Sequence, residues 1–343
     1  MEFQIGSAEA GKKLHRWLRQ QLPGVPLSGV YKLIRTGRVR CNGKKGKMES
    51  VLQEGDRIVL SMADEDYAQV KKKPRSLDLN LPKVDVIYES QDLLVVNKPA
   101  GVLVHDTHTE RHHTLTQQVL TYLAKTRQIE SHGRFQPGPA NRLDRNTSGL
   151  VIFTKNIRTA QMVAEALKWH HLRKWYLALV LGETEKFGVL TESLQRDPDG
   201  RRTRVTESGK TAATSFIRRE TTGKTSVVQV EIMSGRTHQI RAHFANIGHP
   251  LLGDVKYGGG GIHEEKSRLP YRGPDDGGLR GMVNPQVASH QWLHAAWLQL
   301  PSGEIVHAPL PVDFERVLRE SGYSADGVQA LEELVLPFAD EWE

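Results

Sequence analysis

The residues of this chain that could carry out chemistry lie in three segments, and the densest surrounds Asp144. The segment 141–153 reads Asn-Arg-Leu-Asp-Arg-Asn-Thr-Ser-Gly-Leu-Val-Ile-Phe, so that Arg142 and a second arginine flank the aspartate. Positive charge beside a carboxylate stabilises its anionic form, and an anionic carboxylate can act as a nucleophile or a base. The structural alternative is a turn aspartate held by the hydroxyls of Thr147 and Ser148.

A second segment supplies a candidate cation for that carboxylate. Residues 233–248 read Met-Ser-Gly-Arg-Thr-His-Gln-Ile-Arg-Ala-His-Phe-Ala-Asn-Ile-Gly. We expect a strand to end here and a helix to begin at a Thr237 cap, which places Arg236 at the corner between the two elements. A guanidinium is planar and permanently charged, so Arg236 could pair with a carboxylate in a cleft. The alternative is that Arg236 is a surface arginine and that His238 and His243 are ordinary histidines.

The third segment offers an aromatic ring. Tyr176 stands near the start of a predicted strand within Arg-Lys-Trp-Tyr-Leu-Ala-Leu-Val-Leu-Gly (173–182). An aromatic side chain at a strand end can stack on a base that has been turned out of an RNA helix. An ordinary core tyrosine fits the same pattern.

Short apolar runs separated by turns predict the elements that must position these residues. Strands outnumber helices, and no regular βαβ alternation is present, so we predict an α+β fold with a mainly antiparallel mixed sheet. The predicted strands are 84–88, 93–97, 150–154, 176–181 and 227–232, and the predicted helices are 114–125, 157–168 and 237–247. Residues 256–288, rich in glycine and charge, are predicted to form a long surface loop.

The first sixty residues predict a separate small unit. Leu14, Trp17 and Leu18 share one face of a predicted helix, and a second helix is expected to begin at Ser28. Asn42-Gly43 is a strong hairpin signal. We divide the chain into a domain at 1–62, a linker at 63–83, a catalytic domain at 84–325 and an acidic tail at 326–343.

The charge distribution points to a polyanion partner. The net charge is +7, and the first fifty residues carry eleven lysines and arginines against three glutamates. The chain from Pro311 onward carries nine acids against two arginines. A basic N-terminal unit joined to a near-neutral body is typical of a protein that grips RNA through that unit. The alternative is a basic face kept only for solubility.

Composition excludes several other classes. No apolar run approaches the ~20 residues needed to cross a bilayer, so no membrane association is expected. The N-terminus lacks the pattern of a secretory signal. Cys41 is the only cysteine, which rules out a disulfide within the chain. We therefore expect a cytoplasmic protein, and we expect it to be a monomer.

Two stretches of the N-terminal unit resemble the S4 RNA-binding domain. They are Leu-Ser-Gly-Val-Tyr-Lys-Leu-Ile-Arg-Thr-Gly-Arg-Val-Arg-Cys-Asn-Gly-Lys (27–44) and Glu-Gly-Asp-Arg-Ile-Val-Leu (54–60). The resemblance implies that cations of this unit meet RNA phosphates. These cations are Arg16, Lys32, Arg35 and Arg38.

The three chemical segments together resemble the RluA family of pseudouridine synthases. Further matches are Val-Val-Asn-Lys-Pro-Ala-Gly-Val-Leu-Val-His (95–105), His-Pro-Leu-Leu-Gly-Asp (249–254) and Leu-His-Ala-Ala-Trp-Leu (293–298). The matches run in order from about residue 93 to about residue 310. The pair of Arg-Leu-Asp-Arg-Asn-Thr-Ser-Gly with Gly-Arg-Thr-His-Gln-Ile-Arg-Ala-His is highly specific.

The resemblance assigns roles to individual positions. Asp144 matches the catalytic aspartate, and Tyr176 matches the tyrosine that stacks on the target base. Arg236 matches the arginine that pairs with the catalytic carboxylate, and Arg142 matches an arginine that assists base flipping. The sequence departs from the family pattern at Asn141, where the family usually has histidine.

The resemblance implies isomerisation of uridine to pseudouridine in a structured RNA. Large-subunit ribosomal RNA is the expected substrate, and transfer RNA is the alternative. Uracil must leave C1′ through N1, rotate and reattach through C5, a reaction without net redox change or water addition, so we expect neither metal nor cofactor. The carboxylate either attacks C1′ or removes the 2′ proton.

Three other interpretations remain open from the sequence. The first is an inactive RNA-binding or ribosome-assembly protein on the same fold, for which Asn141 is the support. The second is a glycosidase-like hydrolase, which would need a second acid such as Asp254. The third is a metalloprotein that uses the histidine-rich loop. The histidines of that loop are His105, His108, His112 and His113.

Overall fold

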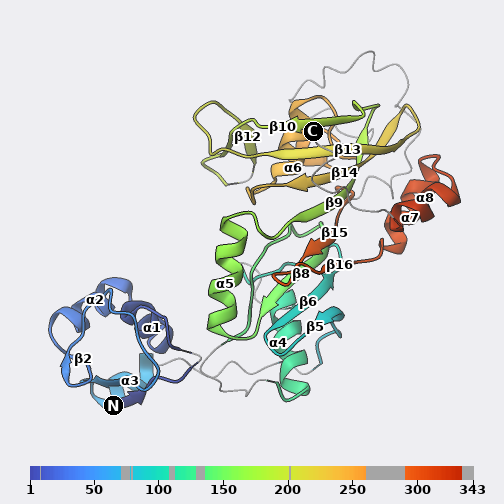
Figure 1. The fold of residues 1–343 in the computed structure, drawn as a ribbon. Helices are drawn as coiled ribbons and strands as arrows, with labels where there is room; N and C mark the ends of the chain where they lie inside the picture. Colours follow the sequence, from blue (N-terminus) through green and yellow to red (C-terminus); the bar gives the residue numbers. More distant parts are fainter. Residues whose placement is uncertain are drawn as a thin grey trace.

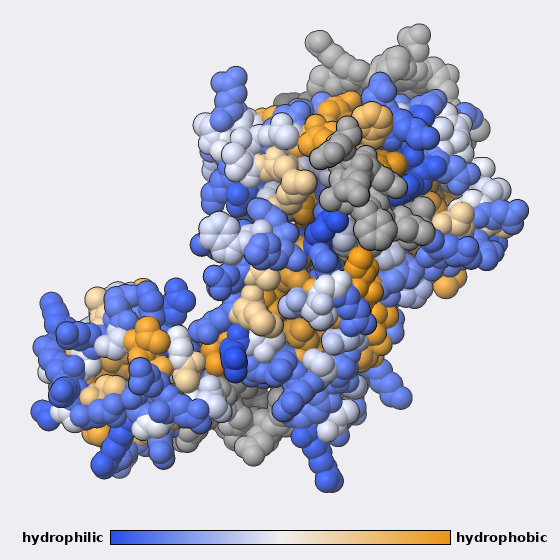
Figure 2. All heavy atoms as spheres, in the orientation of Figure 1, coloured by the Kyte–Doolittle hydropathy of each residue, from blue (hydrophilic) through white to orange (hydrophobic). Residues whose placement is uncertain are grey.

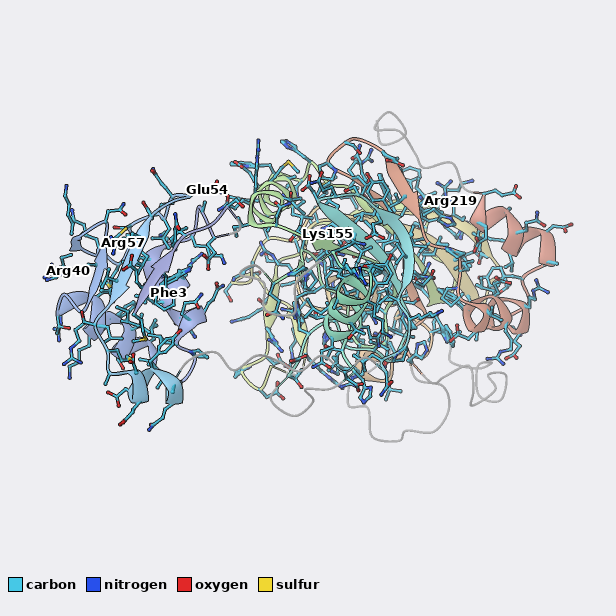
Figure 3. All side chains as sticks on the ribbon, turned by 90° about the horizontal axis from the view of Figure 1, so that it is seen from below. Phe3, Arg40, Glu54, Arg57, Lys155 and Arg219 are labelled. Atoms are coloured by element: carbon cyan, nitrogen blue, oxygen red, sulfur yellow. The ribbon has the colours of Figure 1, made fainter. Side chains whose placement is uncertain are left out.

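A computed structural model of the chain shows two folded units (Figure 1). The structure describes residues 1–7, 9–70, 78, 80–107, 113–128, 136–200, 202–259 and 290–333. Figures 1 and 3 both show the N-terminal unit set apart from the larger unit and next to helix α5 (Ile157–Lys168). The two units touch where the Gln161 side-chain amide donates to the carbonyl of Gly11 at 3.4 Å.

The N-terminal unit is a small antiparallel sheet covered by helices. The strand order is β1-β4-β2-β3. The strands are β1 (Glu2–Gln4), β2 (Val39–Cys41), β3 (Lys44–Lys45) and β4 (Arg57–Leu60), and the helices are α1 (Leu14–Gln21) and α2 (Leu27–Arg35). The predicted helical face of α1 is buried in the core of the unit. The predicted hairpin joins β2 to β3, with positive φ at Asn42 and Gly43 as a tight hairpin turn requires.

The predicted linker is in part structured. Residues of its first part form helix α3 (Asp64–Val70), and Tyr67 and Val70 pack against the core of the N-terminal unit. Three acidic residues in the first turn of α3 complement the positive end of the helix dipole. The N-terminal unit therefore extends to residue 70. The helix was not predicted because the segment has few apolar residues, and only two of its side chains pack against the core.

The larger unit is built on a ten-stranded sheet in the order β10-β13-β14-β9-β15-β8-β6-β5, with β7 paired to β8 and β16 paired to β15. Its strands are β5 (Asp85–Glu89), β6 (Leu93–Lys98), β7 (Gly138–Pro139), β8 (Ser148–Thr154), β9 (Lys174–Leu181), β10 (Phe187–Leu190), β13 (Thr214–Thr221), β14 (Thr225–Ile232), β15 (Leu293–Gln299) and β16 (Ile305–His307). A separate hairpin is formed by β11 (Leu194–Arg196) and β12 (Thr203–Val205). The pairings are antiparallel except that β15 and β8 run parallel, so the predicted mainly antiparallel α+β fold is confirmed.

Helices pack on both faces of the sheet, because alternate side chains of each strand point to opposite faces. On β6 and β8, Leu94 and Phe153 pack with helix α4 (Leu115–Lys125), whereas Ile152 packs with α5 on the other face. The side chains of Thr114 and Asn156 cap α4 and α5 by accepting backbone N–H groups. Helix α6 spans Gln239–Asn246, and a short 3₁₀ helix η1 spans Val255–Tyr257.

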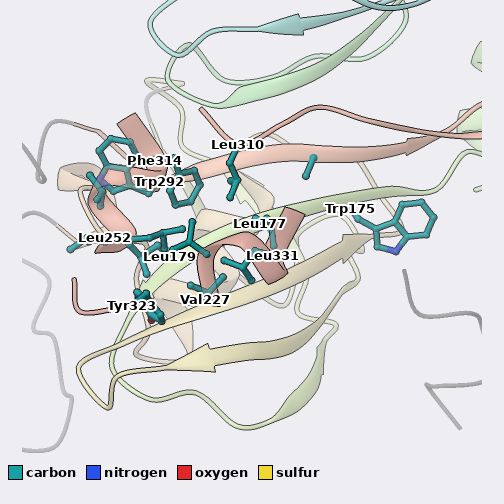
Figure 4. Close-up of a cluster of buried hydrophobic side chains, with 14 of the residues drawn as sticks. Trp175, Leu177, Leu179, Val227, Leu252, Trp292, Leu310, Phe314, Tyr323 and Leu331 are labelled. Carbon is teal, nitrogen blue, oxygen red and sulfur yellow. The ribbon is translucent and has the colours of Figure 1, made fainter. Parts of the chain in front are cut away.

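Two C-terminal helices cover the half of the sheet around β9 and β14. Helix α7 (Val312–Glu320) and helix α8 (Ala325–Glu332) pack on a cluster that includes Trp292 and Leu179 (Figure 4). Val328 and Leu331 of α8 are buried in it. The predicted acidic tail is therefore wrong for residues 326–332, which form a helix whose buried side chains, Val328 and Leu331, recur at helical spacing. Residues 334–343 lie outside the described residues.

The predicted long loop at 256–288 falls mainly outside the described residues, which stop at 259 and resume at 290. Among the described residues, no helix has the length and apolar character needed to span a membrane.

Candidate active site

Asp144 lies in the loop 141–147 that leads into β8, and Asn141 fixes the start of this loop to the strand. The Asn141 amide donates to the carbonyl of Leu150 at 3.1 Å, and its oxygen accepts the backbone N–H of Ile152 at 2.8 Å. Both side-chain groups are therefore used to anchor the backbone. The loop is therefore anchored to β8 even though asparagine stands where the family usually has histidine.

Lys98 at the end of β6 holds the other side of the same loop. Its ammonium group donates to the carbonyls of Pro99 at 2.9 Å, Val102 at 2.8 Å and Arg145 at 2.8 Å. Three acceptors match the three hydrogens of an ammonium group, and the side chain is 0% exposed. Burial lowers the pKa of Lys98 to about 7, and the Asp144 carboxylate opposes that shift. The loop is thus tied to β6 as well as to β8.

The strand that follows the loop is locked against β15. At Gly149 φ is +107°, and a Cβ there would lie 2.2 Å from the carbonyl oxygen of Ala295. Glycine is therefore required for the close parallel approach of β8 and β15. Next to it, Ser148 Oγ lies 2.9 Å from Nδ1 of the fully buried His294, whose Nε2 lies 3.1 Å from the carbonyl of Ala308. The Ser148 hydroxyl thus serves the packing of the sheet.

The Asp144 carboxylate meets a cation and an imidazole at one of its two oxygens. Arg241 Nη1 donates to Asp144 Oδ2 at 2.7 Å, and His238 Nε2 lies 3.7 Å from the same oxygen. The Asp144 side chain is 26% exposed. Among the described residues, both of these contacts fall on Oδ2.

Arg241 is itself held by a second carboxylate. Its Nε donates to Asp254 Oδ2 at 2.6 Å and its Nη2 donates to Asp254 Oδ1 at 2.9 Å, a bidentate pair with both side chains buried. The guanidinium also lies over the ring of Tyr257 at 5.0 Å. Burial alone would lower the pKa of Arg241, but hydrogen bonds and charges of Asp254 and then Asp144 raise it above its ordinary value. Arg241 is therefore a fixed cation.

The predicted partner of Asp144 was wrong. Arg236 is exposed, and its Nε donates to the carbonyl of Thr211 at 3.1 Å. The reason is the start of α6, which begins at Gln239 after His238 adopts a left-handed conformation with φ 55°. This start replaces the predicted Thr237 cap and puts Arg241, in the first turn of α6, against the carboxylate. Arg236 still lines the same pocket.

Tyr176 lies on the pocket side of β9. Alternation along the strand sends Trp175 and Leu177 to the α7–α8 side and Tyr176 to the side of α6. Tyr176 is 6% exposed. Burial, and then the negative charge of Asp144, raise the pKa of Tyr176 well above its ordinary value, so the phenol stays neutral.

These side chains line one pocket that opens to solvent. All four residues predicted for the catalytic domain contribute to it, and so do the newly identified His238 and Arg241. The predicted four are Arg142, Asp144, Tyr176 and Arg236.

The four predicted RNA-binding residues lie on the N-terminal unit. Arg16 is on α1, Lys32 and Arg35 are on α2, and Arg38 follows α2; all four are exposed. Figure 2 shows that the visible face of this unit is dominated by hydrophilic residues, and Figure 3 shows further charged side chains there, including Arg40. They are separate from the pocket and present a basic surface of their own.

In the described part of the chain, no cluster of three or more histidine, cysteine or acidic side chains is arranged to hold a metal ion. Of the histidine-rich loop, His108 and His112 lie outside the described residues. Asp254, considered as a second acid for hydrolysis, is buried in its pair with Arg241.

Sequence reasoning missed Arg241, the part played by Lys98 and the pairing of Asp254. Arg241 directly follows Ile240, which is buried with Phe244 on one face of α6. A charged residue next to such an apolar face can point toward a pocket rather than into solvent. That spacing was a usable signal. The contacts of Lys98 and Asp254 join segments far apart in the chain, and local spacing holds no signal for them.

Comparison with known proteins identifies the family of the chain. The profile of a family described as RNA pseudouridylate synthase matches residues 92–246. An uncharacterized RNA pseudouridine synthase of Aquifex aeolicus is 33% identical over 263 residues, covering 75% of this chain and 80% of that protein. A ribosomal large subunit pseudouridine synthase C of Salmonella typhimurium is 32% identical, covering 90% of this chain and 92% of that protein.

A solved structure supports the fold. Human RNA pseudouridylate synthase domain containing 4 superimposes with a TM-score of 0.55 at 24% identity, covering 69% of this chain and 92% of that chain. The fold is thus that of an α+β domain of the pseudouridylate synthase type. The chain belongs to the RNA pseudouridine synthase family, which confirms the resemblance of its catalytic domain to the RluA group. It is an isomerase that acts on RNA.

Proposed function

We propose that Asp144 is the catalytic carboxylate and that the enzyme isomerises specific uridines of large-subunit ribosomal RNA. The observation that carries the catalytic assignment is the contact of Arg241 with one oxygen of Asp144 inside a pocket that Tyr176 also lines. The guanidinium fixes the plane of the carboxylate, and Oδ1 is then the oxygen that meets the ribose.

The reaction requires few groups. The N1–C1′ bond of uridine breaks, the uracil turns, a C5–C1′ bond forms, and the hydrogen of C5 is lost to solvent while N1 gains a proton. Asp144 either attacks C1′ or removes the 2′ proton, and both routes use one carboxylate. Tyr176 stacks on the detached uracil because its ring lies on the pocket wall and its phenol stays neutral. No cofactor or metal is assigned to a step.

The nucleotide must first leave its helix or stack, which costs a few kcal/mol. Arg142 and Arg236 are exposed at the same pocket and can bind the phosphates of an extruded nucleotide. This role is open to Arg236 because Arg241 takes the contact with Asp144. We therefore keep the predicted substrate-binding role of Arg142, Tyr176 and Arg236, and assign the pairing with Asp144 to Arg241.

The choice of ribosomal RNA rests on the name of the Salmonella relative and on the basic N-terminal unit. We propose that this unit is an S4-type domain in which Arg16, Lys32, Arg35 and Arg38 contact phosphates. We propose that the enzyme acts as a monomer. The enzyme would meet its substrate in the cytoplasm.

Two measurements test this function. In the first, the purified enzyme is mixed in excess with large-subunit RNA labelled with tritium at uridine C5. We expect tritium release and pseudouridine in the digested RNA. Free uracil would indicate a hydrolase, and RNA binding without release would indicate an inactive protein.

In the second, pseudouridines are mapped in cells with and without the gene. We expect positions of large-subunit RNA to lose the modification when the gene is absent. Loss only from transfer RNA would contradict the ribosomal assignment and leave the isomerase assignment in place.

A further inference from the structure

A chain of polar contacts runs from the β11–β12 hairpin to Asp144. The backbone N–H of Thr203 donates to the Tyr257 hydroxyl oxygen at 2.8 Å. That oxygen lies 2.9 Å from His238 Nδ1, and His238 Nε2 lies 3.7 Å from Asp144 Oδ2. Thr203 and Tyr257 are buried. We call these four residues the Thr203–Asp144 chain.

The proton positions in this chain follow from its first link. The Tyr257 oxygen already accepts the amide proton of Thr203, so its own proton is free to be donated to His238 Nδ1. A neutral imidazole that accepts at Nδ1 carries its hydrogen at Nε2. In the other tautomer the Tyr257 oxygen would have to accept hydrogen bonds from both Thr203 N–H and His238 Nδ1–H, and the Tyr257 hydroxyl would have to turn from the imidazole toward the buried Thr203 Oγ1.

We propose that His238 is a positioning residue for Asp144, that it presents an Nε2–H group to Oδ2, and that the hairpin sets this tautomer through Tyr257. The proposal rests on the proposed function of Asp144 only for its effect on the reaction. A separation of 3.7 Å is longer than a hydrogen bond, and such contacts commonly shorten when substrate binds. With Arg241 on the same oxygen, the arrangement directs Oδ1 toward the ribose.

The imidazole acts as a neutral donor. Burial lowers the pKa of His238 to about 4. Arg241 and Lys256 disfavour a second positive charge at this place, whereas Asp144 and Asp254 favour one. A neutral N–H orients the carboxylate without cancelling the charge that the reaction uses, because Arg241 already supplies the cation.

Packing and a hydrogen bond connect the β11–β12 hairpin to His238 through Tyr257. Tyr257 packs with Leu194 of β11 and Ala242 of α6 in one small buried cluster. Thr203 is the first residue of β12, and its N–H group reaches Tyr257. A displacement of the hairpin would withdraw that N–H group. The Tyr257 oxygen could then accept a hydrogen bond from His238 Nδ1–H, so that both neutral tautomers of His238 would be populated.

The tautomer can be observed without any RNA. Long-range proton–nitrogen spectra of the full-length protein with nitrogen-15 histidine separate the two neutral tautomers and the cation. His238→Gln assigns the signal by its disappearance. We expect the Nε2–H tautomer at pH 7 in the wild type, and a mixture of tautomers in Tyr257→Phe and in Thr203→Pro. Tyr323→Phe is the matched control, since it removes a buried hydroxyl that bonds Thr225 outside the site.

Kinetics then connect the tautomer to the reaction. We expect His238→Ala and Tyr257→Phe to lower kcat roughly tenfold, the effect of one lost hydrogen bond, with KM for RNA changed less than about threefold. His238→Gln should recover most of the rate, because an amide supplies both an acceptor and an N–H donor. His171→Ala, an exposed histidine outside the pocket, should behave as the wild type.

The outcomes separate the two proposals. An Nδ1–H tautomer or an imidazolium in the wild type, or a Tyr257→Phe spectrum identical to the wild type, would overturn the Thr203–Asp144 chain whether or not the enzyme is active. The expected spectra with an unchanged kcat in His238→Ala would overturn the positioning role. The expected spectra in a protein that forms no pseudouridine would contradict the proposed function and leave the tautomer assignment intact.

Discussion

The Arg241 guanidinium donates to Asp144 Oδ2 at 2.7 Å while its other edge is held by a buried carboxylate. A cation shared in this way cannot rotate to follow a moving partner. Asp144 is therefore oriented by a group that is rigid before the substrate arrives, and preorganisation of this kind is a major source of rate enhancement in enzymes.

The first prediction concerns this contact. Arg241→Lys keeps the charge but cannot bridge two carboxylates with one ammonium group. We expect kcat to fall by roughly 10²-fold, the scale of a lost preorganised donor, with a smaller change in RNA affinity. Arg173→Lys is the control, because Arg173 makes an equivalent bidentate pair with buried Glu231 away from the pocket. Equal losses of kcat in both variants would assign the effect to folding.

The second prediction concerns the anchor of the Asp144 loop. Asn141→Ala removes two hydrogen bonds to β8, and we expect a loss of about 1–3 kcal/mol in the free energy of unfolding together with a lower kcat. Asn141→His should keep most of both, because its two ring nitrogens can donate and accept. Urea unfolding and tritium release measure the two effects. An Asn141→Ala enzyme with wild-type stability and rate would show that the loop keeps its conformation without these two hydrogen bonds.

The third prediction concerns acid stability. Burial lowers the pKa of His294 to about 4, below the ordinary value of 6.5. The unfolded chain then binds a proton between those values that the folded protein excludes, so the stabilisation is complete above pH 6.5 and is lost as the pH falls toward 4. One such group contributes a slope of up to about 1.4 kcal/mol per pH unit.

Unfolding by urea between pH 4 and 7 measures this slope. We expect His294→Gln to be less stable at pH 7 and to show a slope reduced by one proton. The exposed His171→Gln should keep the wild-type slope. A wild-type slope in His294→Gln would mean that other buried histidines account for the acid sensitivity.

The fourth prediction concerns the N-terminal unit. Lys32→Gln combined with Arg35→Gln removes two exposed cations of α2. We expect weaker RNA binding and a slope of log affinity against log salt that is smaller by about two contacts. Arg316→Gln combined with Arg319→Gln, on α7, removes the same charge elsewhere and should leave the salt slope unchanged. Equal effects of the two pairs would mean that only net charge matters.

Sequence patterns predicted much of this fold because apolar periodicity is a local property. The helices at 114–125 and 157–168 and all five predicted strands appear with small shifts at their ends. Helix α3 escaped because it is short and needs only Tyr67 and Val70 to pack. Helix α8 was not predicted because its acidic residues suggested a solvated tail.

The sequence predicted which residues line the pocket but not which of them contact one another. Asp144, Tyr176, Arg142 and Arg236 do share one pocket. The choice between Arg236 and Arg241 depended on where α6 begins, and that start is set by a left-handed His238 that no local pattern announces.

The fifth prediction tests the central claim. Asp144→Asn keeps the size of the side chain and its place in the loop but removes the reactive carboxylate. Asp85→Asn, an exposed aspartate on edge strand β5, is the control. Thermal unfolding confirms that both variants are folded before they are compared.

The measurement is single-turnover tritium release from RNA labelled at uridine C5, with RNA affinity measured on the same samples. We predict that Asp144→Asn releases no tritium above background while it binds RNA within about threefold of the wild type, and that Asp85→Asn behaves as the wild type. Substantial tritium release by Asp144→Asn would contradict the assignment of this carboxylate as the catalyst.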